Sequence, residues 1–102
     1  MLEPDGPVKI SLIIISKNER QYLRHTVDHL RLPKTIPCEV IVVDDGSQDN
    51  STRFLETGDY KKIRTIRTSG IGPNGARVLG VEASKGEILL FLDAHVIPEK
   101  NL

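Results

Sequence analysis

Hydrophobic and polar positions along the chain occur in blocks rather than alternating residue by residue. Three blocks are almost wholly apolar, two of them rich in β-branched residues, and a fourth block mixes apolar and polar positions. Blocks of this kind, bounded by turn-forming residues, are typical of strands that are covered on both faces of a parallel sheet. The predicted strands are residues 10–15, 38–43, 63–67 and 88–92.

The segments between these strands carry helical patterns. Leu23, Val27 and Leu30 recur at helical spacing, so they predict a helix after the first strand. Asn18 can cap this helix, and Pro33 ends it. Two further helices are expected at about residues 52–56 and 75–84.

Strands therefore alternate with helices in the order βαβαβαβ. Connections between parallel strands of one sheet are almost always right-handed, so this order predicts an α/β, Rossmann-like parallel sheet with helices on both faces. We expect the strand order 3-2-1-4, with a ligand at the switch point between the first and fourth strands. Residues 1–7 are expected to form a flexible leader, and residues 8–102 the folded part, whose last seven residues suggest the start of another helix.

Composition limits what the chain can do. Its 102 residues suffice for one domain of modest size, and its 14 Lys and Arg balance its 14 Asp and Glu. This balance gives no overall charge field that would attract nucleic acid or an anionic membrane surface. No apolar stretch approaches the roughly 20 residues of a membrane span. The single Cys38 excludes an internal disulfide and fits a reducing, cytoplasmic compartment.

An acidic residue and a histidine follow the fourth predicted strand directly, as Asp93-Ala94-His95. Residues two apart in an extended chain face the same side, so Asp93 and His95 can reach one ion together. A carboxylate paired with an imidazole suits Mn or Zn better than Ca, which takes oxygen ligands. On spacing alone, an equal alternative is that Asp93 caps the following turn and His95 is an ordinary loop residue.

The second predicted strand also ends in acids, Asp44 and Asp45, followed by the turn residues Gly46 and Ser47. The carboxyl ends of parallel strands meet at one edge of the sheet. Two such strands ending in acids form a cleft for a cationic or metal-bound ligand, which favours the metal interpretation of Asp93 and His95.

Four short motifs follow one another across nearly the whole chain after residue 8. They are Ser-Lys-Asn-Glu at 16–19, Val-Val-Asp-Asp-Gly-Ser at 42–47, Gly-Ala-Arg-Val-Leu-Gly at 75–80, and Lys-Gly-Glu at 85–87 leading into Leu-Asp-Ala-His at 92–95. Together they resemble the donor-binding, N-terminal half of a GT-A-type, family-2-like nucleotide-sugar glycosyltransferase. The Asp-X-His motif is similar to that of the polypeptide N-acetylgalactosaminyltransferases, which are retaining enzymes. The other relatives, which are inverting, usually have Asp-X-Asp. The resemblance therefore leaves the stereochemistry of transfer open.

The resemblance implies a nucleotide diphosphate sugar donor, with a UDP-sugar expected, and a divalent metal such as Mn or Mg. Asp93 and His95 would hold the metal at the donor, and the metal would bridge the two phosphates. Arg77 would reach the diphosphate from the start of its helix. The alternative for Arg77 is a solvated arginine on the helix surface.

The resemblance also implies which residues lie near the nucleoside. Asp45 would accept a hydrogen bond from the imide N–H of uracil, a donor that cytosine lacks, and Asp44 would support the turn or the ribose. Alternatively, both acids merely cap the turn with Gly46. The first motif would contribute Ser16, Asn18 and Glu19. An acid at position 19 is equally explained by the dipole of the helix that follows it.

Two positions depart from the resemblance. Lys17 stands where the family commonly has an aromatic residue that stacks on the base, which weakens the uridine assignment. Ile15 stands where Pro is usual, which affects only the turn.

The remaining metal ligand, the acceptor site and any catalytic base would follow residue 102. We therefore interpret the chain as a fragment that lacks full activity on its own, and a non-catalytic nucleotide-binding or interaction module is the alternative. A phosphoacceptor receiver domain is disfavoured because its acid pair follows the first strand. Residues 88–92 would form an exposed apolar edge strand, which predicts self-association.

Overall fold

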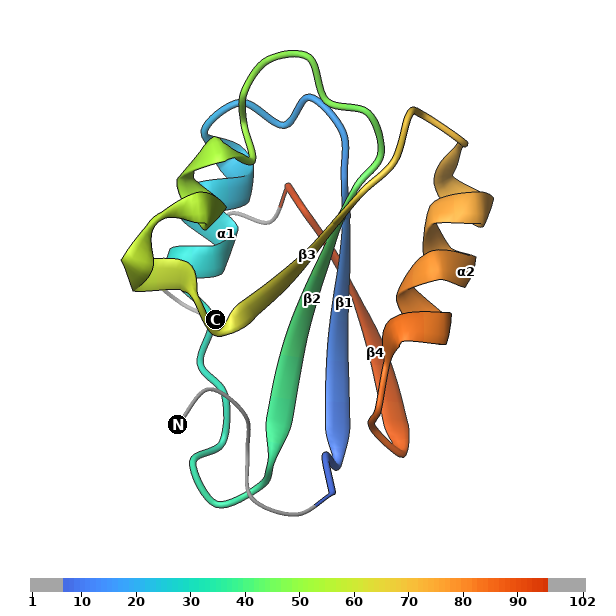
Figure 1. Ribbon diagram of the computed structural model, residues 1–102. Coiled ribbons are helices and arrows are strands. Elements are labelled where there is room, and N and C mark those ends of the chain that lie inside the picture. The colour runs from blue at the N-terminus through green and yellow to red at the C-terminus, as the bar shows by residue number, and fades with distance from the viewer. Residues whose placement is uncertain (1–6, 96–102) are drawn as a thin grey trace.

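Four parallel strands in the order β3-β2-β1-β4 form the centre of the protein, in a computed structural model that describes residues 7–95 (Figure 1). The predicted strand order and strand positions are confirmed. The expectations for residues 1–6 of the leader and for a helix at 96–102 lie outside the described residues. The strands are β1 (Ile10–Ser16), β2 (Cys38–Asp44), β3 (Ile63–Arg67) and β4 (Ile88–Asp93).

Helical segments cover both faces of this sheet, so the molecule has three layers (Figure 1). On one side lie α1 (Tyr22–Asp28) and the 3₁₀ helices η1 (Arg53–Glu56) and η2 (Gly58–Tyr60). On the other side lies α2 (Pro73–Ala83). Between residues 7 and 95 no helix is long and apolar enough to cross a membrane.

The core divides between the two faces of the sheet because successive side chains of a strand point to opposite sides. Toward α1 and η1 the strands present residues such as Ile14 and Val42, which pack with Leu23 and Leu55. Toward α2, Ile41 and Val43 pack with Ala76 of that helix. The central strands β1 and β2 are buried on both faces, as their unbroken apolar composition predicts.

The helices differ from the prediction in their ends. Asn18 does not cap α1, which begins at Tyr22 and ends at Asp28, well before Pro33. The side-chain oxygen of Asn18 instead accepts a hydrogen bond from Gln48 N (2.7 Å). The predicted cap was wrong because a neighbouring loop, 30 residues away in sequence, uses this side chain.

The other two helices are found close to their predicted positions. The segment expected at 52–56 is the 3₁₀ helix η1, and a second 3₁₀ turn, η2, follows it. The helix expected at 75–84 begins two residues earlier, at Pro73. Proline is well tolerated in the first turn of a helix, where its missing N–H would have no intrahelical partner.

A buried carboxylate, Glu39 of β2, ties the end of the sheet opposite the acidic strand ends to the segment after α2. Its Oε2 accepts hydrogen bonds from Ser11 Oγ and from the backbone N–H of Lys85, both at 2.6 Å. Its Oε1 lies 3.2 Å from the guanidinium of Arg64. Burial by itself raises the pKa of Glu39, but the hydrogen bonds from Ser11, Lys85 and Arg64 outweigh it and hold the pKa below the ordinary value.

Glu39→Gln should lower the free energy of unfolding by about 1 to 3 kcal/mol at neutral pH, because buried donors then lose their charged acceptor. A carboxyl whose pKa is lower in the folded state stabilises the fold fully above its unfolded-state pKa. That contribution disappears as the pH falls through the lowered pKa. Urea unfolding should therefore separate the variant from the parent at about pH 7, and the difference should shrink as the pH falls below the unfolded-state pKa and through the lowered one.

Glu87→Gln is the matched control, because Glu87 pairs with Lys9 at the exposed surface. Surface pairs of this kind add little stability. If Glu39→Gln changes stability no more than Glu87→Gln at neutral pH, the Glu39 network is not a stabilising feature.

The strand β4 lies at one edge of the sheet and carries exposed apolar side chains. Ile88, Leu90 and Phe91 are 44%, 48% and 49% exposed. An exposed apolar edge strand offers unpaired backbone groups to another chain. Self-association through β4 stays a prediction that rests on this exposure.

Candidate functional site

The carboxyl ends of the strands bring the residues of the predicted site to one edge of the sheet. In the strand register, Ser16 of β1 lies opposite Asp44 of β2. Ile15 lies opposite Asp93 of β4, and Asp44 opposite Arg67 of β3. The two acidic strand ends recognised in the sequence are therefore neighbours of β1 on its two sides.

His95 is held against the start of α1. Its ring stacks on the ring of Tyr22, with centroids 3.8 Å apart and planes 15° apart. Its Nδ1 lies 3.6 Å from Glu19 Oε1, and its backbone N–H donates to Asp93 Oδ1 (3.1 Å). The hydroxyl of Thr26 donates to the carbonyl of Ala94 (2.8 Å). Asp93 does accept the hydrogen bond of a turn, but His95 has specific partners at one face and one edge of its ring.

The donor set at Asp93 and His95 is suited to a divalent metal. A carboxylate oxygen and an imidazole nitrogen fit Mn or Zn. Among residues 7–95, no three His, Cys, Asp or Glu side chains are arranged to hold an ion. The pair would supply two ligands, which leaves coordination positions for phosphate oxygens.

Asp45 is 2% exposed, and its carboxylate binds the loop between β3 and α2. Its Oδ1 accepts hydrogen bonds from Thr68 Oγ1 (2.6 Å) and Ile71 N (2.8 Å), and its Oδ2 accepts one from Gly72 N (3.0 Å). The Thr68 hydroxyl and the Ile71 N–H, with a smaller effect from Gly72, hold the pKa of Asp45 below its ordinary value although burial opposes them. Asp45 is thus ionised at neutral pH.

The turn at Gly46 fits closely against the same loop. Gly46 has φ +82°, a conformation that other residues rarely adopt. A β-carbon there would lie 2.9 Å from Gly70 N, which is closer than real β-carbons approach a backbone nitrogen. Position 46 therefore requires glycine for two independent reasons, conformation and space.

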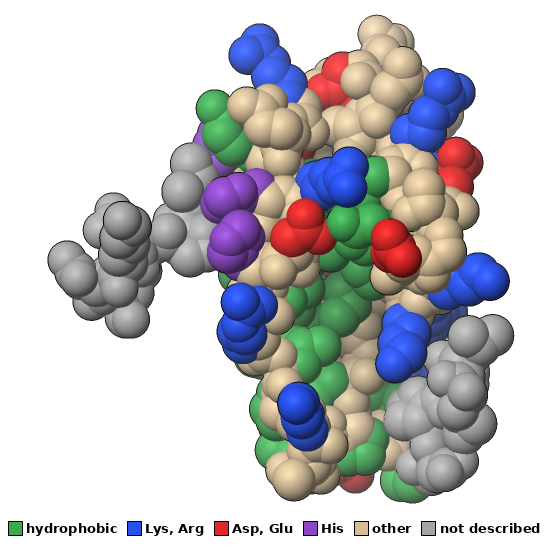
Figure 2. All heavy atoms as spheres, turned by 90° about the vertical axis from the view of Figure 1, so that its left-hand side faces the viewer, with side chains coloured by type: hydrophobic (Ala, Val, Ile, Leu, Met, Phe, Trp, Pro, Cys, Tyr) green, Lys and Arg blue, Asp and Glu red, His purple; other side chains and the backbone are tan. Residues whose placement is uncertain are grey.

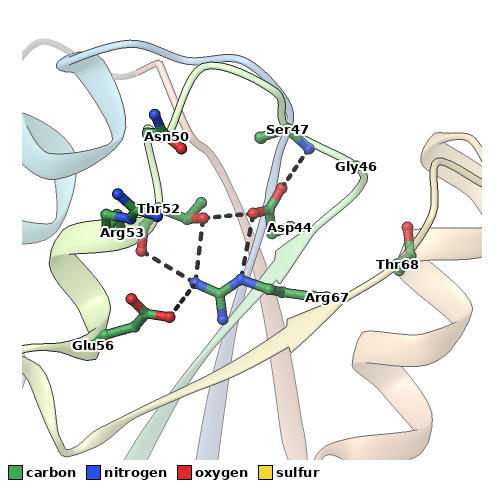
Figure 3. A pocket seen from close by; sticks show the side chains of 9 residues that line it. All are labelled: Asp44, Gly46, Ser47, Asn50, Thr52, Arg53, Glu56, Arg67 and Thr68. Atoms are coloured by element: carbon green, nitrogen blue, oxygen red, sulfur yellow. Dashed lines mark hydrogen bonds and ion pairs between the residues drawn. The ribbon is translucent and has the colours of Figure 1, made fainter.

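Asp44 supports the turn after β2 from the other side. Its Oδ1 accepts a hydrogen bond from Ser47 N (2.9 Å), and its Oδ2 accepts one from Thr52 Oγ1 (2.5 Å). Figure 3 shows the side chain of Arg67 extending toward both Asp44 and Glu56. Its Nε lies 3.9 Å from Asp44 Oδ2, and its Nη2 lies 3.8 Å from Glu56 Oε1. Asp44 thus contacts the turn, its role toward the ribose stays a prediction, and Arg67 and Thr52 are partners that the sequence interpretation missed.

These residues border a small polar pocket of about 200 Å³ on the side of the sheet that carries η1 (Figure 3). Its two arginines and two acids balance in charge. Figure 2 views the molecule from the side that carries α1 and η1. On this face, basic and acidic side chains are likewise interspersed around a strip of hydrophobic ones. The pocket is lined by Asp44, Gly46, Ser47, Asn50, Thr52, Arg53, Glu56, Arg67 and Thr68.

The remaining predicted residues take different positions. Ser16 is 1% exposed, and within the described part of the chain its hydroxyl has no hydrogen-bond partner. The backbone N–H of Asn18 donates to Ser47 Oγ (2.9 Å), so Asn18 joins the loops after β1 and β2. Arg77 is exposed on α2, where its guanidinium contacts Asn74 at 3.5 Å rather than Asp93 or His95.

The fold resembles solved glycosyltransferase structures. The structure of Staphylococcus aureus TarS 1–349 in complex with UDP-GlcNAc superposes with a TM-score of 0.71 and 28% identity, covering 86% of this chain and 27% of that one. The mannosyltransferase PcManGT of Pyrobaculum calidifontis, in complex with GDP-Man and Mn²⁺, gives a TM-score of 0.74 over 97% of this chain and 31% of that one. Its 22% identity supports the fold alone.

Sequence comparison agrees with the fold. An uncharacterized glycosyltransferase of Nostoc sp. is 36% identical over 90 residues, covering 85% of this chain and 28% of the relative. Polypeptide N-acetylgalactosaminyltransferase 3 of Drosophila melanogaster is 36% identical over 101 residues, covering 88% of this chain and 15% of the relative. The chain thus spans less than a third of the length of either protein. The model of glycosyl transferase family 2 matches residues 11–102, and the chain belongs to this family.

Proposed function

We propose that this chain is the donor-binding portion of a metal-dependent glycosyltransferase that transfers a sugar from a UDP-sugar to an acceptor. The observation that carries the proposal is the meeting of Glu19, Asp93 and His95 at the carboxyl edge of the sheet, on one side of β1, with Asp44 and Asp45 on the other. In open α/β sheets this edge is where ligands bind.

Asp93 and His95 would hold the metal in this proposal. A bound divalent metal supplies positive charge that compensates the diphosphate as the nucleotide leaves. Arg77 would reach the same diphosphate from α2, and the support is that its guanidinium is exposed and has no acidic partner among the described ion pairs. Charge at the phosphates is then shared between the metal and one arginine.

Asp45 reads the base in this proposal. An ionised carboxylate offers about four acceptor positions, and Thr68, Ile71 and Gly72 use three of them. The fourth is assigned to the imide N–H of uracil. The support is that the other three bonds already fix the orientation of the carboxylate, so base binding does not have to order it.

The residues at the end of β1 complete the nucleoside side. The buried hydroxyl of Ser16 is without a partner in residues 7–95, which is costly unless a ligand or water supplies one. We assign it to the donor. Asn18 acts indirectly, because its contacts with Ser47 and Gln48 fix the turn that carries Asp45.

Calorimetric titration of the chain with UDP, CDP and GDP, each in Mn²⁺ and in EDTA, tests the proposal. We expect UDP to bind most tightly and only in the presence of the metal. Equal affinity in Mn²⁺ and EDTA would contradict the metal role, and equal affinity for UDP and CDP would contradict the uridine assignment.

A further inference from the structure

The imidazole of His95 is fixed on two sides by residues that are not themselves part of the Asp-X-His motif. Tyr22 covers one face of the ring at 3.8 Å, in a nearly parallel stack. Glu19 faces one edge of the ring, with its Oε1 3.6 Å from Nδ1. Each of these contacts restricts a different motion, since the stack limits tilting of the ring and the carboxylate limits its flipping.

The contact with Glu19 distinguishes the two nitrogens of the ring. In a neutral imidazole one nitrogen carries the proton and the other carries the lone pair that binds a metal. The separation of 3.6 Å is slightly longer than a hydrogen bond, and a carboxylate there favours the proton on Nδ1, since a small movement lets it accept the N–H. The lone pair is then on Nε2, on the opposite edge of the ring.

The helix that carries Tyr22 is itself anchored to the Asp-X-His segment. The backbone N–H of Tyr22 donates to the carbonyl of Glu19 (2.9 Å), which sets the two residues in one turn. One turn further along, Thr26 donates to the carbonyl of Ala94, the middle residue of the motif. The buried Leu23 fixes this face of α1 in the core. The two supports of His95 therefore have defined positions.

We propose that Glu19 and Tyr22 are positioning residues that hold His95 in the Nδ1–H form with Nε2 presented to the divalent metal. The proposal rests on the function assigned above to Asp93 and His95. It gives Glu19 a role different from contact with the nucleoside, and it gives a role to Tyr22, which the sequence alone did not single out. Partners of this kind typically affect metal affinity by roughly 10- to 100-fold.

Four variants test the two supports. Tyr22→Leu and Glu19→Ala should each weaken Mn²⁺ binding by roughly 10-fold or more. Tyr22→Phe keeps the stacked ring and Glu19→Gln keeps an oxygen acceptor, so both should restore most of the affinity. Tyr60→Leu is the matched control, because Tyr60 makes an edge-to-face contact with Phe54 rather than a stack on His95 and should leave Mn²⁺ binding unchanged.

The ring nitrogens of His95 can be observed without metal. Long-range ¹H–¹⁵N spectra of the metal-free chain, recorded where the imidazole is neutral, should show Nδ1 protonated, and the ring protons should carry the upfield shift of a stacked aromatic. Tyr22→Leu should remove that shift, and Glu19→Ala should mix the two tautomers. An Nε2–H form in the parent chain overturns the proposal, whether or not metal binds.

The metal titration separates this inference from the proposed function. If the parent chain and His95→Ala are equally poor at binding Mn²⁺, the metal role of the motif fails, and the spectra alone decide the orientation of His95. If His95→Ala abolishes binding while Tyr22→Leu and Glu19→Ala bind like the parent, the metal role holds and the positioning inference is overturned. If Glu19→Gln abolishes binding as completely as His95→Ala, Glu19 is a metal ligand rather than a positioning residue.

Discussion

His95→Ala should reduce Mn²⁺-dependent UDP binding by more than roughly 100-fold, the upper end of what outer partners of a metal ligand contribute. The reason is that the described residues contain no group of three possible ligands, so the variant keeps only Asp93 of the proposed pair. One ligand cannot hold the ion against water, and the two phosphates then lose most of their charge compensation. Calorimetry with UDP at saturating Mn²⁺ measures the loss.

His25→Ala is the control for this experiment. The ring of His25 lies beside that of His29 on the exposed surface of α1, in a tilted contact with centroids 4.2 Å apart, and it contacts neither Asp93 nor Glu19 in the described contacts. It should leave both metal and UDP binding unchanged. A UDP affinity that survives His95→Ala but disappears in His25→Ala would place the metal at the surface pair instead.

Asp45→Asn should weaken UDP by about 1 to 2 kcal/mol, roughly 5- to 30-fold, and weaken CDP less. The amide retains one oxygen acceptor but lacks charge, and its NH₂ group cannot accept the bond that Gly72 N donates. The uracil imide and the loop then compete for fewer acceptors. Because the pKa of Asp45 is lowered, its own contribution to UDP binding by the parent should be lost only under acidic conditions.

Asp49→Asn provides the comparison for Asp45→Asn. Asp49 also accepts two backbone hydrogen bonds, from Ser51 N and Arg20 N, both at 3.0 Å, and the loss of its charge should cost stability in the same way. We expect it to leave the preference for UDP over CDP intact. If Asp45→Asn weakens both nucleotides equally, or leaves both unchanged, Asp45 holds the loop without reading the base.

The sheet could be predicted because its determinants are local. Unbroken β-branched runs identify β1 and β2 directly, and the handedness of the crossovers then leaves few possible strand orders. The ends of α1 could not be predicted in the same way. The side chain of Asn18 has two possible partners, the first turn of the helix and Gln48, and only the folded arrangement of two loops decides between them.

The residues of the candidate site show the same difference between local determinants and contacts that form only on folding. The acids at the strand ends were evident because each follows an apolar run, and strand pairing brings them together. The partners of those acids were not evident, since Asp45 binds residues 23 to 27 positions further along the chain. Arg67 and Tyr22 were missed for the same reason, because nothing in their neighbouring residues distinguishes them from a solvated arginine and an ordinary helical tyrosine.

Two of the three hydrogen bonds that Asp45 accepts come from backbone N–H groups, those of Ile71 and Gly72. The state of the carboxylate therefore affects how readily these two amides exchange with solvent. The N–H groups of Ile71 and Gly72 are protected from exchange only while they donate to Asp45. A ligand that uses the free acceptor position stiffens the loop and slows their exchange, whereas a ligand that displaces Gly72 releases the loop and speeds it. Two amide protons in the loop before α2 thus report, without any label, how the carboxylate at the end of β2 is occupied.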